Sequence, residues 1–238
     1  MINSLNNQKI IELNKLKQKK YQEERRCFLV EGLHLVNEAK EQGLLIEAFS
    51  LKEEEGFTQV SAPVLKKLSQ TTGDVDYVGV CHMPSNKKLS DKILILDDIK
   101  DPTNLGTILR SAKAFGFNTV IASNETVSFF NDKVVRGSQG AIFKLNLINA
   151  NLGDKIQELI SLGYSIYGTN VRNGIDIKEV KETSKIALMM GNETRGLKEE
   201  YQNLAKANLY IKLDDMESLN VSVCASIMMY ELKQKREL

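Results

Sequence analysis

The chain has 238 residues, of which 42 % are hydrophobic and 26 % are charged, and its formal net charge is +1. This composition is typical of a folded globular protein with one large or two small domains, and it excludes collagen-like and disordered chains. No apolar run approaches the roughly twenty residues of a membrane span, and the N-terminus lacks the apolar stretch of a secretory signal. We therefore expect a cytoplasmic protein that does not contact membranes.

The sequence offers little material for several common chemistries. Its histidines are only His34 and His82, which disfavours a histidine-based metal site or a Ser-His-Asp triad. The cysteines Cys27, Cys81 and Cys224 form no C-x-x-C pair, which fits neither a disulfide framework nor a zinc knuckle. Phosphate-binding and dinucleotide-binding glycine motifs are missing as well. We therefore expect no metal site, and any cofactor must be held by another kind of loop.

Residues 1–88 are predicted to form a small α/β domain. Residues 1–26 carry seven basic and three acidic side chains, a local charge of +4 (7 − 3), and we call them the basic arm. Apolar side chains at helical spacing predict a helix over 5–20 in this arm. The other predicted elements, in chain order, are a strand at 27–31, a helix at 33–42, a strand at 46–51, a helix at 62–68 and a strand at 77–81. A polar stretch at 83–88 is the predicted linker.

Residues 89–238 are predicted to form a second α/β domain. The elements alternate along the chain, with strands at 92–97, 118–122, 165–169, 185–190 and 207–212 and helices at 104–115, 131–138, 154–162, 198–204 and 220–235. Such alternation predicts a parallel sheet that is covered on both faces. In open sheets of this class, ligands bind outside the carboxyl ends of the strands.

Three polar segments each follow a predicted strand of the second domain. They read D-P-T-N-L-G-T-I-L-R over 101–110, G-N-E-T-R-G-L over 191–197 and S-L-N-V-S-V over 218–223. In this order they resemble motifs 1, 2 and 3 of the SpoU (TrmH-like) branch of the SPOUT RNA methyltransferases. The segment F-L-V-E-G at 28–32 resembles the substrate-binding domain that many members carry, so the resemblance covers nearly the whole chain.

The resemblance implies transfer of a methyl group from S-adenosylmethionine to a ribose 2′-oxygen of RNA. It also implies a homodimer formed through the C-terminal domain, whose parallel sheet carries a deep trefoil knot, preceded by a small α/β RNA-binding domain. Ribosomal RNA is preferred over transfer RNA because the compact tRNA ribose methylases of the family generally lack an N-terminal α/β domain. Two alternatives remain, a tRNA 2′-O-methyltransferase and a noncatalytic RNA-binding or ribosome-assembly protein of the same fold. The sequence does not identify the methylated nucleotide.

The resemblance assigns catalytic roles to Arg110, Asn104, Glu193, Ser218 and Asn220. A methyl sulfonium needs no metal to activate it, but the ribose hydroxyl is a poor nucleophile and must be oriented and deprotonated. Because an arginine stays protonated, we interpret Arg110 as a group that positions a phosphate or the 2′-oxygen. The proton then leaves to solvent or to a carboxylate such as Glu193. The alternative is that Asn104, Ser218 and Asn220 cap helices and that Arg110 is an exposed helical residue.

The resemblance further implies that the main chain at Gly191, Ile211 and Leu219 holds S-adenosylmethionine. For Gly191 the alternative is a purely structural turn, which glycines in a strand-to-helix loop often serve. Lys212 and Leu213 depart from the I-P-M that many members carry after the last strand. Lys212 either faces solvent or crowds the adenine pocket, and it is the only sequence feature that favours the noncatalytic alternative.

Four further residues have competing interpretations. Arg136 is either an RNA contact or a surface charge. Asp97 and Asp98 are adjacent at a strand end, so they should point to opposite faces, which argues against a paired acid and base. Cys224 is interpreted as a packing residue and not as a nucleophile.

Overall fold

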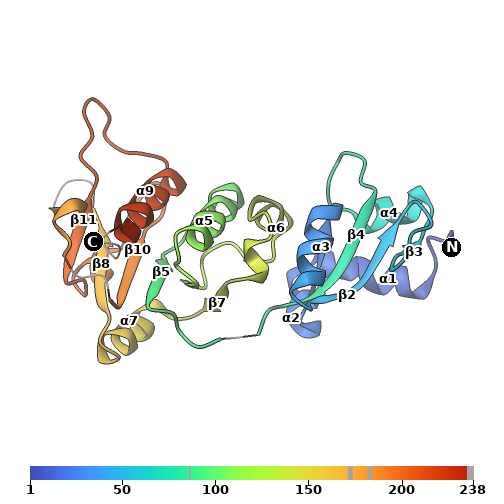
Figure 1. Ribbon diagram of the computed structural model, residues 1–238, viewed down its shortest axis with the longest axis horizontal. Coiled ribbons are helices and arrows are strands. Elements are labelled where there is room, and N and C mark those ends of the chain that lie inside the picture. The colour runs from blue at the N-terminus through green and yellow to red at the C-terminus, as the bar shows by residue number, and fades with distance from the viewer. Residues whose placement is uncertain (86, 171–173, 182–183, 235–238) are drawn as a thin grey trace. The chain divides into compact units, whose positions relative to one another are not determined.

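The computed structural model describes residues 1–85, 87–170, 174–181 and 184–234, and the chain divides into two compact units (Figure 1). The N-terminal unit comprises Met1–Ser85 and Ser128–Lys144, and the C-terminal unit comprises Asn86–Val127 and Leu145–Leu238. The predicted linker at 83–88 spans the first crossing between the units. Residues 128–144 also belong to the N-terminal unit. The predicted division at residue 88 assigned them to the second domain.

The N-terminal unit has a four-stranded sheet in the order β1-β4-β2-β3. Its strands are β1 (Cys27–Glu31), β2 (Leu45–Ser50), β3 (Thr58–Gln59) and β4 (Tyr77–His82). The pairs β1–β4 and β4–β2 are antiparallel, and β2–β3 is parallel. Its helices are α1 (Gln8–Asn14), η1 (Lys15–Lys17), α2 (Lys19–Arg25), α3 (Leu33–Glu41), α4 (Ala62–Leu68), α6 (Asp132–Gly137) and η2 (Ala141–Phe143).

The basic arm is helical, but the single helix predicted over 5–20 is wrong. The helix begins after Asn7, whose side chain accepts hydrogen bonds from the amides of Lys9 and Ile10. Gln18 is extended, with φ −107° and ψ 131°, and it separates η1 from α2. Two helical segments, 8–17 and 19–25, therefore replace one long helix, and the buried Ile10 and Leu16 anchor the first segment to the sheet.

Aromatic packing explains why 128–144 belongs to the N-terminal unit. The buried Phe28 ring of β1 lies 4.8 Å from the Phe130 ring and 6.0 Å from the Phe143 ring, measured between centroids. Arg136 of α6 pairs with Asp132 at 2.9 Å and with Glu31 of β1 at 3.9 Å. The guanidinium of Arg136 thus pairs with two carboxylates of the N-terminal unit.

The C-terminal unit confirms the predicted parallel sheet. Its strand order is β7-β6-β5-β10-β8-β11-β9, and every neighbouring pair is parallel. The strands are β5 (Lys92–Leu96), β6 (Thr119–Ala122), β7 (Asn146–Asn149), β8 (Ser165–Thr169), β9 (Ile175–Asp176), β10 (Ile186–Met190) and β11 (Ala207–Tyr210). The helices are α5 (Pro102–Ala114), α7 (Leu152–Ser161), η3 (Ile177–Glu179), α8 (Glu199–Gln202) and α9 (Val221–Gln234). The short strands β7 and β9 were not predicted from the sequence.

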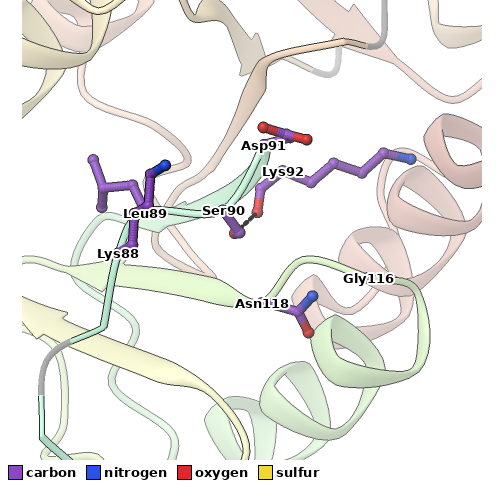
Figure 2. A pocket seen from close by; sticks show the side chains of 7 residues that line it. All are labelled: Lys88, Leu89, Ser90, Asp91, Lys92, Gly116 and Asn118. Atoms are coloured by element: carbon purple, nitrogen blue, oxygen red, sulfur yellow. Dashed lines mark hydrogen bonds between the residues drawn. The ribbon is translucent and has the colours of Figure 1, made fainter.

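The core of this unit surrounds the central strands. All residues of β5, β6 and β10 are buried, as expected for strands that are covered on both faces. Helices α5 and α9 pack against each other (Figure 1). The buried Lys92 of β5 extends toward α9 (Figure 2), where its Nζ donates a 2.8 Å hydrogen bond to the Leu232 carbonyl. None of the helices in the described ranges is long and apolar enough to cross a membrane.

Candidate functional site

The second motif and the start of α5 meet at one edge of the parallel sheet. β5 and β10 are neighbours and run in the same direction, so the segments that follow Leu96 and Met190 leave the sheet at the same edge. The third motif precedes α9, which packs on α5. Strand order and helix packing therefore gather all three motifs.

Asn104 joins these motifs through its carboxamide. It lies in the first turn of α5 and is 8 % exposed. Its Nδ2 donates to Oε1 of Glu193 at 3.2 Å, and its Oδ1 accepts from Nδ2 of Asn220 at 3.0 Å. Asp101 caps α5 by accepting from the Thr103 amide at 2.7 Å, so the helix cap is not the role of Asn104.

Glu193 accepts hydrogen bonds from the segment that precedes α5. Besides the Asn104 side chain, the amides of Lys100 and Asp101 lie 3.4 Å and 3.3 Å from its two carboxylate oxygens. Glu193 itself is exposed. An ionised carboxylate only accepts hydrogen bonds, so its remaining lone pairs can receive a hydrogen bond from an incoming ligand.

Asn220 combines capping with the link to Asn104. Its Oδ1 accepts from the amides of Ser222 at 2.9 Å and Val223 at 3.4 Å at the start of α9. Its Nδ2 remains available for Asn104. Ser218 is exposed and makes no hydrogen bond within the described part of the chain.

Arg110 is not brought to this cluster. It lies six positions after Asn104 on α5, a rise of about 9 Å at 1.5 Å per residue, and the two side chains leave the helix in different directions. Arg110 is exposed, and its side chain forms no hydrogen bond or ion pair with any residue that the structure describes. Its guanidinium is therefore available to a ligand.

Gly191 has a structural reason to be a glycine. A Cβ at this position would lie 2.0 Å from the Leu197 amide nitrogen and 2.2 Å from the Gly196 carbonyl carbon. The loop closes on itself here, because Asn192 and Gly196 exchange main-chain hydrogen bonds of 3.1 Å and 2.9 Å. The absence of a side chain at Gly191 therefore permits this tight loop, independently of any role in ligand binding.

Of the apolar residues predicted to hold the cofactor, Ile211 lies before the third motif and Leu219 lies within it. Ile211 follows β11, Leu219 precedes α9, and both are half-buried. Lys212 is exposed.

Two adjacent buried aspartates at the end of β5 bind different parts of the loop region. Asp97 pairs with Lys198 at 3.5 Å, and Asp98 pairs with Arg195 and, at 2.5 Å, with Lys100. Asp98 lies beyond the end of β5 with a positive φ of 61°, so the strand alternation assumed in the prediction of opposite faces does not apply to it. No role was predicted for Asp98 or Arg195 from the sequence, although Arg195 lies inside the second motif.

Other chemistries find less support in the described ranges. They contain no group of three or more His, Cys, Asp or Glu side chains placed to hold a metal ion. Burial raises the pKa of the Cys224 thiol to about 11, so the thiolate that a nucleophile requires is scarce near neutral pH.

A cavity of about 340 Å³ lies at the opposite edge of the sheet (Figure 2). It is lined by residues at the amino ends of β5 and β6, including Ser90, Lys92 and Asn118. The cavity is therefore separate from the three motifs.

Burial of Asp97 predicts a pH dependence of stability. Burial raises the pKa of the Asp97 carboxyl above its ordinary value, and Lys198 opposes the shift. A raised folded-state pKa contributes stability at low pH that is lost as the pH rises through that pKa. In urea unfolding, the stability of Asp97→Asn relative to the wild type should therefore increase from about pH 4 to about pH 7.

Lys198→Gln removes the charge that opposes the rise in the pKa of Asp97. The free energy of unfolding of this variant should therefore fall more steeply with pH than that of the wild type, and the difference should disappear when Asp97 is also replaced by asparagine. A relative stability of Asp97→Asn that is constant or falls over this pH range would contradict the assignment.

Comparison with known proteins identifies both parts of the chain. The SpoU rRNA Methylase family matches residues 91–230, and an MRM3-like substrate binding domain matches residues 7–74. The chain is 33 % identical over 244 aligned positions to the 23S rRNA (guanosine(2553)-2′-O)-methyltransferase RlmP of Bacillus subtilis (strain 168), and the alignment covers 98 % of each protein.

Solved structures agree with this match. An rRNA methyltransferase from Sinorhizobium meliloti has a TM-score of 0.87 and 26 % identity, with 98 % of this chain and 96 % of that chain covered. The AdoMet-bound structure of an rRNA methyltransferase from the same organism gives 0.86 and 26 %, with 98 % and 97 % covered. The family match includes Asn104, Glu193 and Asn220, the residues that the fold brings together. The chain belongs to the SpoU rRNA methylase family.

Proposed function

We propose that this chain transfers the methyl group of S-adenosylmethionine to a ribose 2′-oxygen of RNA, and that ribosomal RNA is its substrate class. The observation that carries the proposal is the Asn104 carboxamide, which joins Glu193 and Asn220 at the edge of the sheet where ligands of such folds bind. The B. subtilis relative is named for 23S rRNA, so this RNA is the first substrate to test.

The residues beside the cluster suit S-adenosylmethionine. Gly191 presents main chain without a side chain, and the half-buried Ile211 and Leu219 offer apolar surface to an adenine ring. We propose that these three residues hold the cofactor, with the exposed Lys212 directed away from it. When bound, the cofactor supplies an electrophilic methyl group. Nothing further is required of these residues than to bind and orient it.

The chain's polar residues would then prepare the ribose. We propose that Arg110 positions an RNA phosphate or the 2′-oxygen, since its planar fork of donors has no partner within the described residues. Glu193 would accept the hydroxyl proton, directly or through water. Asn104 and Asn220 would keep Glu193 oriented, and Ser218 is an exposed hydroxyl on the loop beside them.

A homodimer through the C-terminal unit is part of the proposal. One face of α9 is buried in the core through Ala225, Met228 and Leu232. The opposite face exposes Val223, Ile227 and Tyr230, which recur at helical spacing. Tyr230 also packs edge-on against the Phe115 ring at the end of α5, with 5.6 Å between centroids, and an exposed apolar stripe of this kind supports association with a second copy.

The deep trefoil knot also remains a proposal. The insertion of β10 between β5 and β8, and of β11 between β8 and β9, supports a chain that doubles back through its own sheet. We further propose that residues 1–88 bind RNA and precede the catalytic domain at 89–238. A cytoplasmic location accords with a ribosomal RNA substrate.

The substrate class is tested with labelled S-adenosylmethionine. The purified full chain is incubated with 23S rRNA, with 16S rRNA and with a tRNA pool, and RNA-bound label is counted. We expect label in rRNA. Label in tRNA alone would refute the rRNA assignment, and a folded chain that binds no S-adenosylmethionine in a calorimetric titration would favour the noncatalytic alternative.

Arg110 should affect turnover without affecting cofactor binding. We expect Arg110→Ala to lower kcat at least a hundredfold, on the order of 3 kcal/mol in the barrier, while the Kd of S-adenosylmethionine changes less than about twofold. Arg110→Lys should lose nearly as much if both donors of the fork are used, because lysine keeps only the charge.

Lys113→Ala is the matched control for Arg110. It removes a cation from the same helix, where Lys113 contacts Asn118 at 2.9 Å, and should change kcat little. Near-normal turnover of Arg110→Ala, or lost cofactor binding in a folded variant, would make the assigned role wrong.

The basic arm should contribute to RNA affinity through its exposed lysines. Lys17 donates to the Ser69 carbonyl at 2.7 Å and Lys15 pairs with Glu12 at 2.7 Å. Lys19 and Lys20 are exposed, and the pair of Lys19 with Glu23 at 3.6 Å is itself at the surface. Replacing Lys19 and Lys20 by glutamine should reduce the slope of log affinity against log salt by roughly 0.7 to 0.9 for each lost phosphate contact. Lys15→Gln should change the slope less. Equal slopes in all variants would remove the arm from the RNA site.

A further inference from the structure

Asp98 has an unusual conformation at the end of β5. Its φ is +61°, a left-handed conformation that is uncommon for residues other than glycine. Its amide donates to Oγ of Ser123 at 3.0 Å, which ties the turn to the segment after β6. Its side chain is only 4 % exposed. This turn orients the carbonyl of Asp98 toward Asn192 and its buried carboxylate toward Arg195.

Both groups of Asp98 bind the second motif. The Asp98 carbonyl accepts a 2.8 Å hydrogen bond from Nδ2 of Asn192, and its carboxylate pairs with the guanidinium of Arg195. Asn192 immediately precedes Glu193, and Arg195 lies two residues after it. Asp98 therefore holds the loop on both sides of Glu193.

The loop between these two contacts is internally ordered. Oδ1 of Asn192 accepts from the amides of Thr194 at 3.0 Å and Arg195 at 3.1 Å, which forms a turn around Glu193. Such a turn moves as one piece, so its placement on α5 depends on what anchors it from outside. The external anchors are the contacts of Glu193 itself and the two contacts of Asp98.

We infer that Asp98 is a positioning residue, which fixes the second motif through Asn192 and Arg195 so that Glu193 stays on Asn104. The inference rests on the proposed methyl transfer. The side chain of Arg195 is 67 % exposed and adds little to the core. Its ion pair with Asp98 therefore contributes more to the position of the loop than to the free energy of unfolding. A displacement of about 1 Å at a reacting group can cost a hundredfold in rate.

Lys100 provides an internal comparison. Its Nζ lies 2.5 Å from the other carboxylate oxygen of Asp98 and also donates to the Glu125 carbonyl at 2.8 Å. Both partners lie outside the second motif. Loss of the Lys100 side chain therefore removes a cation from the same carboxylate without releasing Asn192 or Arg195.

The test compares three variants of the full chain in methyl transfer to rRNA. Asp98→Asn tolerates the left-handed conformation and keeps the carbonyl contact with Asn192, but it removes the charge that Arg195 requires. We expect Asp98→Asn and Arg195→Gln each to lower kcat at least tenfold, with KM for RNA and Kd for S-adenosylmethionine within about twofold. Lys100→Gln should lower kcat less than threefold.

The double variant Asp98→Asn/Arg195→Gln separates coupling from two independent losses. If both residues act through one contact, the double variant should be no slower than the slower single variant. Multiplicative losses, or equal losses in Lys100→Gln, would overturn the inference. Unchanged kcat in both single variants would overturn it as well.

Amide hydrogen exchange provides a readout that does not require activity. The Thr194, Arg195 and Gly196 amides should exchange at least tenfold faster in Asp98→Asn and at the wild-type rate in Lys100→Gln. Unchanged exchange would refute the positioning role. If the wild type transfers no methyl group to RNA, the proposed function fails, while the exchange rates still report whether Asp98 orders the loop.

Discussion

The hydrogen bonds of the Asn104 side chain are the contacts on which the site depends. A carboxamide has a donor end and an acceptor end, and in Asn104 each end binds a different motif. Because the residue is almost fully buried in the first turn of α5, its side chain has little freedom to turn elsewhere. Asn104 thereby holds two segments that lie 89 and 116 residues further along the chain in one geometry with the start of α5.

The sheet makes this contact possible. β10 lies beside β5 and runs parallel to it, so the second motif leaves the sheet next to the turn that leads to α5. The packing of α9 on α5 brings Asn220 to the same place, and Lys92 ties the far end of α9 to β5. Completely buried strands provide a rigid base, and the polar loops at their carboxyl ends are free to carry chemistry.

The parallel sheet and the three motifs could be predicted because alternation and motif order are local properties of the sequence. Other features depend on long-range contacts that no local pattern encodes. The helix breaks at Gln18, where the sequence contains neither glycine nor proline to signal an end. The return of 128–144 to the N-terminal unit depends on the packing of Phe130 against Phe28. Asp98 and Arg195 are 97 residues apart in sequence, so only the fold reveals their pairing. The sequence predicted the helix that carries both Asn104 and Arg110. The rise of that helix places Arg110 about 9 Å further along its axis.

The central claim is that the chemistry at this edge of the sheet occurs on a ribose oxygen. Alkaline hydrolysis of labelled product RNA tests it most directly, because a 2′-O-methyl group removes the hydroxyl that cleaves the adjacent phosphodiester. The account predicts that the transferred label is recovered in alkali-resistant dinucleotides. Label recovered in mononucleotides would place the methyl group on a base and would contradict the account.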